Sequence, residues 1–341
     1  MSIAGEKAAF REYLESYRYP TADRYEDAVN QFFAPDSMIN IVHPFNKIVG
    51  AQVYADRFLA VLRDAFDCLC RTDYIAFGGT FEGTAWVTST GYYSGHFVRP
   101  LLGIAPSGAL ANLRFGEFHR MENGRAVESY IFLDIPELMI ACNCWPIKDS
   151  PGRDRGFTGY LPGPATQDGL VWEATNPERS ASSYAMVTEM LRSLATEDEA
   201  WRPFWHPNML WYGPAAFGSF IGIENFAGFQ VPFESTFSEW IGGSVEGSRT
   251  QHFARFADGD YICSGGWPSL NAVQARPFLD QLSKGQRLFM RVCDWWRRDG
   301  DLLVENWVFV DIPHVLLQLG VDLFPGFHDG PETVLADMES L

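Results

Sequence analysis

The sequence predicts an α+β fold built from two tandem copies of one domain. The phrase VESYIFLDIP (127–136) returns as VENWVFVDIP (304–313), and six of the ten positions are identical. In each half of the chain, segments with helical periodicity come first and segments with strand-like alternation follow, an order typical of α+β domains. The length of 341 residues also suits about two domains. We therefore interpret the chain as an internal repeat.

Copy one is predicted to span 1–148. Its helices are expected where apolar residues recur every three or four positions, at 1–17, 21–33 and 55–66. Its strands are expected where polar and apolar residues alternate, at 84–97, 111–121 and 127–135. A short helix at 136–143 closes the copy.

Copy two is predicted to span 178–341 and to repeat this order. A helix is expected at 196–205, strands at 249–256, 261–267, 287–298 and 302–312, and a closing helix at 313–320. Between the copies, 149–177 is predicted as a linker, because the stretch 145–177 holds five prolines and five glycines.

Charge and composition exclude several classes of partner. The net charge is −17 and the pI about 4.8. Such a surface repels phosphate backbones and anionic headgroups, so we expect neither a nucleic-acid nor a membrane partner. The sequence has no run of apolar residues long enough for a transmembrane helix and no signal-peptide pattern at its start, so the expected location is the cytoplasm.

The repeated phrase contains an aspartate in each copy, Asp134 and Asp311. Each stands where a strand gives way to a helix, directly before Ile-Pro. Asp is a favoured N-cap and proline suits the first helical turn, so capping is preferred over catalysis for both residues.

The segment LLGIAPSGALANLRFGEFHRMENGRAVESY (101–130) resembles the SnoaL-like polyketide cyclases of the nuclear transport factor 2-like superfamily. Copy two keeps the strand pair GQRLFMRVCDWWRRDGDLLVENW (285–307) but lacks the G-I-x-P-T-G turn of that family. The resemblance implies two cone-shaped α+β barrels, each with N-terminal helices packed on a curved antiparallel sheet.

The resemblance also implies a departure in chemistry. In the cyclases an Asp on the last strand serves as general acid/base, with a His two residues before it. The matched positions are Ile131 and Ser129 in copy one, and Val308 and Asn306 in copy two. An aliphatic side chain cannot transfer a proton, so Ile131 and Val308 are predicted only to contact substrate.

Strand alternation indicates another pair of carboxylates. In LRFGEFHRM (113–121), Glu117 shares a face with Phe115 and His119, and in MRVCDWWRR (290–298), Asp294 shares a face with Trp296. An apolar pocket raises the pKa of a carboxyl group, which suits that group to proton transfer near neutrality. We therefore predict Glu117, His119 and Asp294 as catalytic candidates, with Phe115 beside them. A buried ion pair that holds the sheet together is the structural alternative.

Other side chains are predicted to contact the substrate. His43 follows a strand, and His96 occupies a position that the resemblance places near the ligand end of the cone. Trp211 and Trp296 offer flat surfaces for a planar ligand, although core packing explains both rings as well. The sequence contains no phosphate loop and no nucleophile elbow. Its Cys-x-Cys pairs are spaced too narrowly for a usual zinc site, so no metal or other cofactor is predicted.

Two functions follow from these observations. The first is a cofactor-free acid/base enzyme acting on a small hydrophobic carbonyl-bearing molecule; the second is a non-catalytic module that binds such a molecule. Copy one is expected to keep the working pocket, although the richer aromatic content of copy two leaves the reverse assignment open. Single-copy members of the family that the chain resembles commonly pair through their sheets, so the resemblance implies a pseudo-dimer within one chain, with a homodimer also left open. Large rings on the second sheet face suit such a contact.

Overall fold

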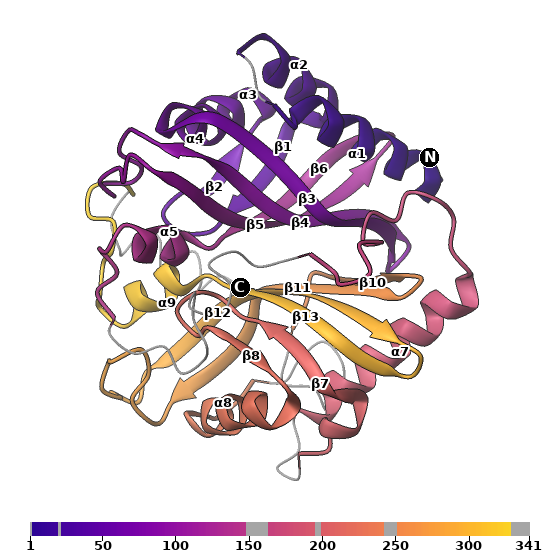
Figure 1. The fold of residues 1–341 in the computed structure, drawn as a ribbon, viewed down its shortest axis with the longest axis vertical. Coiled ribbons are helices and arrows are strands. Elements are labelled where there is room, and N and C mark those ends of the chain that lie inside the picture. Colours follow the sequence, from indigo (N-terminus) through magenta and orange to yellow (C-terminus); the bar gives the residue numbers. More distant parts are fainter. Residues whose placement is uncertain (1, 20–21, 148–162, 195–198, 242–250, 329–341) are drawn as a thin grey trace. The chain divides into compact units, whose positions relative to one another are not determined.

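The computed structural model describes residues 2–19, 22–147, 163–194, 199–241 and 251–328 (Figure 1). The chain divides into two compact units. Of the described residues, unit 1 holds those up to Trp145 together with 163–174 and 322–328, and unit 2 holds 146–147 and those from Thr175 to Val321. About half of the predicted linker, 149–162, lies outside the described residues.

Unit 1 is a curved sheet with the strand order β2-β1-β6-β5-β4-β3. Neighbouring strands are antiparallel except β1 and β6, which run parallel because the chain crosses from β2 to the far edge and returns through hairpins. Its strands are β1 (Phe33–Ile41), β2 (Asn46–Val49), β3 (Phe66–Phe81), β4 (Thr84–Phe97), β5 (Leu110–Glu122) and β6 (Arg125–Leu133).

Unit 2 repeats this path with the order β10-β11-β12-β13-β7-β8, and a short strand β9 pairs with β11. Among the described strands of unit 2, β13 and β7 form the one parallel pair, in the position of β6 and β1. The predicted tandem α+β repeat is therefore confirmed. The strands are β7 (Trp205–Tyr212), β8 (Ser219–Ile221), β9 (Phe237–Ser238), β10 (Ala254–Asp258), β11 (Tyr261–Gln274), β12 (Arg287–Asp299) and β13 (Leu302–Val310).

Helices lie against the sheet of each unit, most of them over one face (Figure 1). Among the described residues, each helix is too short or too polar to span a lipid bilayer. In unit 1 they are α1 (Ile3–Tyr17), α2 (Ala22–Phe32), α3 (Ala51–Tyr54), a π-helical turn (Ala55–Leu59), α4 (Ala60–Ala65) and α5 (Ile135–Ala141). In unit 2 they are α7 (Pro177–Ser193), a 3-10 turn (Arg202–Phe204), α8 (Ile223–Ser235) and α9 (Ile312–Gln318).

Two elements differ from the sequence predictions. The helix predicted at 196–205 is wrong in its described part, because Arg202–Phe204 is a 3-10 turn and β7 begins at Trp205; residues 196–198 lie outside the described residues. The long helix of copy two is α7, which comes earlier. Strand β3 was not predicted, because register shifts at two points break the alternation of its side chains.

The repeated aspartates cap the closing helices, as predicted. The Asp134 side chain accepts a hydrogen bond from the Glu137 N–H at 3.3 Å, and Asp311 accepts one from the His314 N–H at 3.2 Å. Asp311 also forms a buried ion pair with Arg291 on β12 at 3.0 Å. These contacts assign both aspartates to the architecture of the repeat.

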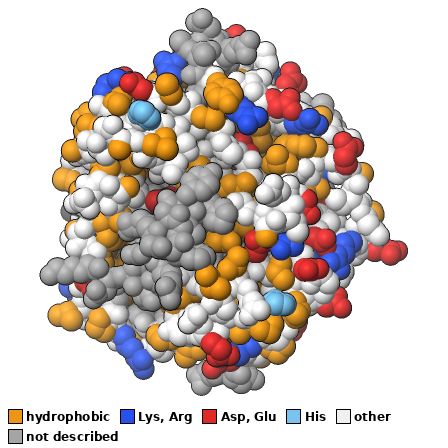
Figure 2. Space-filling view, in the orientation of Figure 1, with side chains coloured by type: hydrophobic (Ala, Val, Ile, Leu, Met, Phe, Trp, Pro, Cys, Tyr) orange, Lys and Arg blue, Asp and Glu red, His pale blue; other side chains and the backbone are white. Residues whose placement is uncertain are grey.

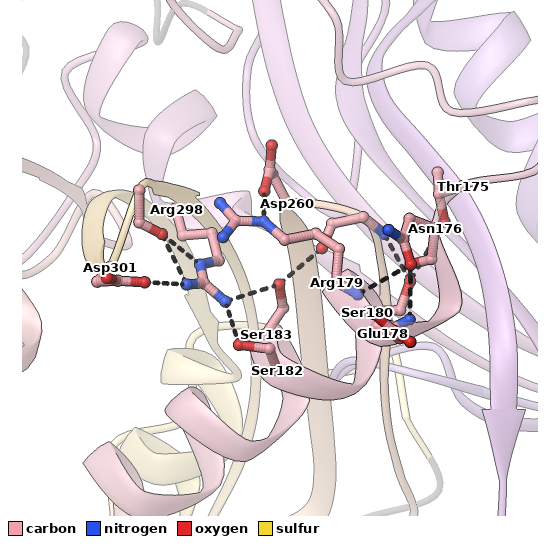
Figure 3. Close-up of polar contacts among 12 residues, drawn as sticks. Thr175, Asn176, Glu178, Arg179, Ser180, Ser182, Ser183, Asp260, Arg298 and Asp301 are labelled. Carbon is pink, nitrogen blue, oxygen red and sulfur yellow. Dashed lines mark hydrogen bonds and ion pairs between the residues drawn. The ribbon is translucent and has the colours of Figure 1, made fainter.

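A polar network fixes helix α7 on the strands of unit 2 (Figure 3). Asn176 caps the helix through hydrogen bonds from the Glu178 and Arg179 N–H groups. Arg298 on β12 donates to Ser182 Oγ at 3.0 Å and to the Asp301 carboxylate at 2.9 Å. The network therefore sets the position of the apolar residues at the far end of α7.

Acidic and basic side chains are intermingled on the face of the molecule that Figure 2 shows.

Residues 163–174, part of the predicted linker, pack on unit 1. The Val171 N–H donates to the Ala76 carbonyl at 2.8 Å, and Lys7 Nζ donates to the Glu173 carbonyl at 2.9 Å. This segment therefore adds main-chain pairing to β3.

Candidate functional site

Unit 2 contains a cavity of about 140 Å³ between its helices and its sheet. Helices α7 and α8 supply one wall, and strands β7, β11, β12 and β13 supply the other. Apolar and aromatic residues dominate the lining, as in most small-molecule sites. They include Met190, Leu191, Trp205, Trp211, Phe226, Phe229, Met290, Val292, Trp296 and Val308.

Asp294 is the acidic residue that β12 contributes to this cavity. It stands between Ser264 on β11 and Val308 on β13, and it is only partly exposed. Burial raises the pKa of its carboxyl group to about 7, although Asn306 and Arg255 act in the opposite direction. The Asn306 amide donates to Oδ1 at 3.4 Å, and no described Lys or Arg forms an ion pair with Asp294.

Two tryptophans of the lining carry a buried indole N–H group that has no hydrogen-bond acceptor among the described residues. They are Trp205 and Trp296. The two side chains are 5% and 2% exposed. Buried donors are normally paired, and both nitrogen atoms are themselves buried, so a ligand oxygen in the cavity would reach them only after neighbouring side chains shift.

Glu117 occupies the position in unit 1 that Asp294 occupies in unit 2. It stands on β5 between Ser89 on β4 and Ile131 on β6, as Asp294 stands between Ser264 and Val308. The Glu117 carboxylate forms a buried ion pair with Arg71 of β3 and accepts a hydrogen bond from Ser89 Oγ at 3.1 Å. The two carboxylates therefore share a fold position but not an environment.

The raised pKa predicted for Glu117 is wrong. Burial does raise it, but Arg71 and His119 together outweigh burial and lower the pKa of Glu117 to about 2. His119 Nε2 lies 3.4 Å from Oε1, while its Nδ1 lies 2.8 Å from Ser129 Oγ. Glu117 is thus an ionised partner in a salt bridge, which is the structural alternative considered from the sequence.

Arg71 occupies the space beside Glu117 that a ligand would need. Its guanidinium lies 4.3 Å from the centre of the Phe115 ring and also pairs with Asp73 at 2.8 Å. The Arg71 side chain is fully buried. The expectation that copy one keeps the working pocket therefore loses its support, because an ion-pair network surrounds its carboxylate.

The remaining predicted residues fall into separate groups. Trp211, Trp296 and Val308 line the cavity with Asp294. Ile131 is buried opposite Glu117. The prediction that His96 lines a pocket is corrected, because His96 is exposed on β4.

His43 is buried in unit 1, and the centre of its ring lies 6.1 Å from the centre of the Phe324 ring. Sequence reasoning missed Trp205 and the whole contribution of α7. One available signal was overlooked: Phe226, Phe229 and Phe233 recur at helical spacing on α8, and all three line the cavity.

No family model and no curated protein matches this chain. Among solved structures, a protein from Jannaschia sp. CCS1 assigned as a SnoaL-like polyketide cyclase is 22% identical, with a TM-score of 0.35. That match covers 42% of this chain and 94% of the other. A protein from Xanthomonas campestris pv. campestris assigned as a polyketide cyclase is 18% identical over 41% of this chain and 99% of its own, with a TM-score of 0.35.

A third match is a hypothetical protein with a ketosteroid isomerase-like fold from Catenulispora acidiphila, solved in complex with trimethylamine. It is 12% identical, with a TM-score of 0.31, and the match covers 43% of this chain and 95% of the other. SnoaL-like cyclases, which the sequence resembles, are thus among the solved structures similar to this chain. In each case nearly the whole of a smaller protein corresponds to less than half of this chain.

Proposed function

We propose that the cavity of unit 2 binds a small, largely apolar molecule bearing a carbonyl group, and that Asp294 transfers a proton on this molecule. The observation that carries the proposal is a carboxyl group with a pKa of about 7 inside an aromatic cavity. At neutral pH both protonation states of such a group are populated, which is the condition for an efficient general acid/base.

The donors of the cavity suit this chemistry. Asp294 in its ionised form accepts a proton from the carbon next to the carbonyl, and the carbonyl oxygen gains negative charge. The indole N–H groups of Trp205 and Trp296 would bind that oxygen once the ligand displaces the side chains that cover the two nitrogen atoms. The protonated Asp294 then returns the proton to another position, so the reaction is a proton shift that needs no other reactant.

The cavity limits the size of the ligand. Its volume of about 140 Å³ is close to that of an engineered cavity of about 150 Å³ that binds benzene. A ligand with one ring, or a short branched chain, therefore fits. The lining of Trp211, Phe226 and Phe229 favours a flat apolar body.

The second candidate is binding without catalysis. One observation favours it: Val308 stands directly opposite Asp294, where the cyclases that the sequence resembles carry their acid/base Asp. Asp294 would then serve only as a hydrogen-bond donor to the ligand in its protonated form.

One experiment separates the two candidates. Ligands retained by the native protein are identified by mass spectrometry, and the carbonyl compound found is incubated with the protein in heavy water. Deuterium exchange beside the carbonyl, followed by NMR, is expected with the wild-type chain. A retained carbonyl compound that shows no exchange above the buffer rate would favour the binding module.

Replacing Trp296 with Phe is expected to weaken binding of the carbonyl ligand at least about fivefold. An aromatic ring remains, although a smaller one, and one neutral hydrogen bond is lost, worth about 1 kcal/mol. Calorimetry measures the affinity for the ketone and for the hydrocarbon of the same shape, and the ketone should lose more affinity than the hydrocarbon. Trp201→Phe is the matched control, because Trp201 also has an unpaired buried indole N–H among the described residues but does not line the cavity. Equal losses for ketone and hydrocarbon would contradict the role of the N–H group.

A further inference from the structure

A second group of chemically competent side chains lies in unit 1. His43 follows β1, in the turn that leads to β2, and Asp322 and His328 belong to the segment 322–328. Each offers one ligand atom, and these atoms all lie within 4.8 Å of one another. His43 is fully buried, and the His328 side chain is 2% exposed.

The three side chains are held by contacts of their own. Asp322 Oδ1 accepts a hydrogen bond from the Phe324 N–H at 2.9 Å, while Oδ2 lies 3.0 Å from His328 Nε2. The centres of the His43 and His328 rings are 4.9 Å apart. Phe324 lies against His43 and contributes an apolar wall. The carboxylate is thus oriented by the turn that carries it, as metal-bound carboxylates commonly are.

We propose that His43, Asp322 and His328 form a Zn²⁺ site. Two imidazole nitrogens and one carboxylate oxygen are a common zinc ligand set, with water in the fourth position. Oxygen-seeking Mg²⁺ and Ca²⁺ do not select two histidines. Ligand atoms around tetrahedral zinc lie about 3.3 Å apart, so the three residues need shifts of only about 1 Å to close on the ion.

The site would attach the segment 322–328 to the β1–β2 turn of unit 1. Its ligands come from opposite ends of the sequence, so metal binding favours only the folded state in which these ends meet. The alternative is a metal-free hydrogen bond between Asp322 and His328, which the same 3.0 Å distance also allows. The zinc site and the metal-free hydrogen bond differ in whether a zinc ion is bound and whether His43 is one of its ligands.

The test is zinc binding by the full chain after treatment with a chelator. Equilibrium dialysis against Zn²⁺, followed by elemental analysis, is expected to give one ion per chain. The visible spectrum of the Co²⁺-loaded protein should show the bands of a four-coordinate site. Asp322→Asn and His328→Asn are each expected to weaken zinc binding at least tenfold, and zinc should raise the melting temperature of the wild-type chain but not that of these two variants.

His96→Asn is the matched control, because His96 is an exposed histidine of the same unit. It should bind zinc as the wild type does, and circular dichroism confirms the fold of every variant. Wild-type stoichiometry in the Asp322→Asn/His328→Asn double variant would overturn the proposal. So would zinc that is lost on replacing the exposed Cys68 and Cys144 with Ser, or wild-type protein that takes up no zinc at all.

Discussion

Glu117→Gln is expected to lower the free energy of unfolding by about 3 kcal/mol at neutral pH. Arg71 is fully buried and pairs with two carboxylates, those of Glu117 and Asp73. The substitution removes one of them, so the buried positive charge of Arg71 keeps only Asp73 as a partner of opposite charge. Urea denaturation measures the change. The pKa of Glu117 is lowered to about 2, so its stabilising effect is fully present above about pH 4.5 and is lost as pH falls toward 2. The difference between wild type and variant should shrink over the same range.

Glu122→Gln is the matched control for this prediction. Glu122 lies on the same strand, β5, but is exposed and pairs with Arg120 at the surface. Such surface pairs contribute little, so this variant should change the free energy of unfolding by less than about 0.5 kcal/mol. If Glu117→Gln proved as harmless as Glu122→Gln, the ion-pair network would not be a stabilising element of unit 1.

Asp294→Asn is expected to reduce turnover of the carbonyl ligand by a factor of about 10² to 10⁴, because the amide can neither accept nor return the proton. Its effect on stability should have the opposite sign from that of Glu117→Gln. The pKa of Asp294 is raised to about 7, so its ionisation opposes folding: the contribution of Asp294 to stability falls as pH rises from about 4 to about 7 and is constant above. Each pH unit in that window corresponds to at most about 1.4 kcal/mol. The Asn variant lacks this dependence.

Asp299→Asn provides the comparison, because Asp299 is an exposed aspartate at the end of β12. It should leave both turnover and the pH dependence of stability as in the wild type. Full turnover by Asp294→Asn would contradict the catalytic role. A stability difference between wild type and Asp294→Asn that does not vary from pH 4 to pH 8 would contradict the raised pKa.

The sequence was sufficient to predict the repeat and the matched carboxylates. Strand alternation alone places Glu117 and Asp294 at equivalent positions, and the ladders confirm this, with Ile131 and Val308 opposite them. The environment of the carboxylates was not predictable, because it depends on Arg71, which β3 supplies across a bulged stretch. A side chain that arrives from an irregular strand leaves no periodic signal in the sequence.

The cavity itself was only partly predictable. The sequence predicts Trp211 and Trp296 from their aromatic side chains and Val308 from the family resemblance, whereas Trp205 and the α7 residues reach the cavity through tertiary packing. His43 was selected as a pocket residue, but its neighbours Asp322 and His328 come from the other end of the chain. Local patterns do not reveal such long-range pairings, because sequence spacing carries no information about which distant segments meet.

The division of unit 1 into separate stretches of sequence has a consequence for biosynthesis. A ribosome releases the chain from its first residue onward, and domains commonly fold as they emerge. Unit 1 includes 163–174 and 322–328, so its last described segment leaves the ribosome only after all of β7 to β13 has been made. Nascent unit 1 must therefore wait, with the surface around His43 not yet covered by Phe324 and His328, until β13 has been made and the segment 322–328 follows it.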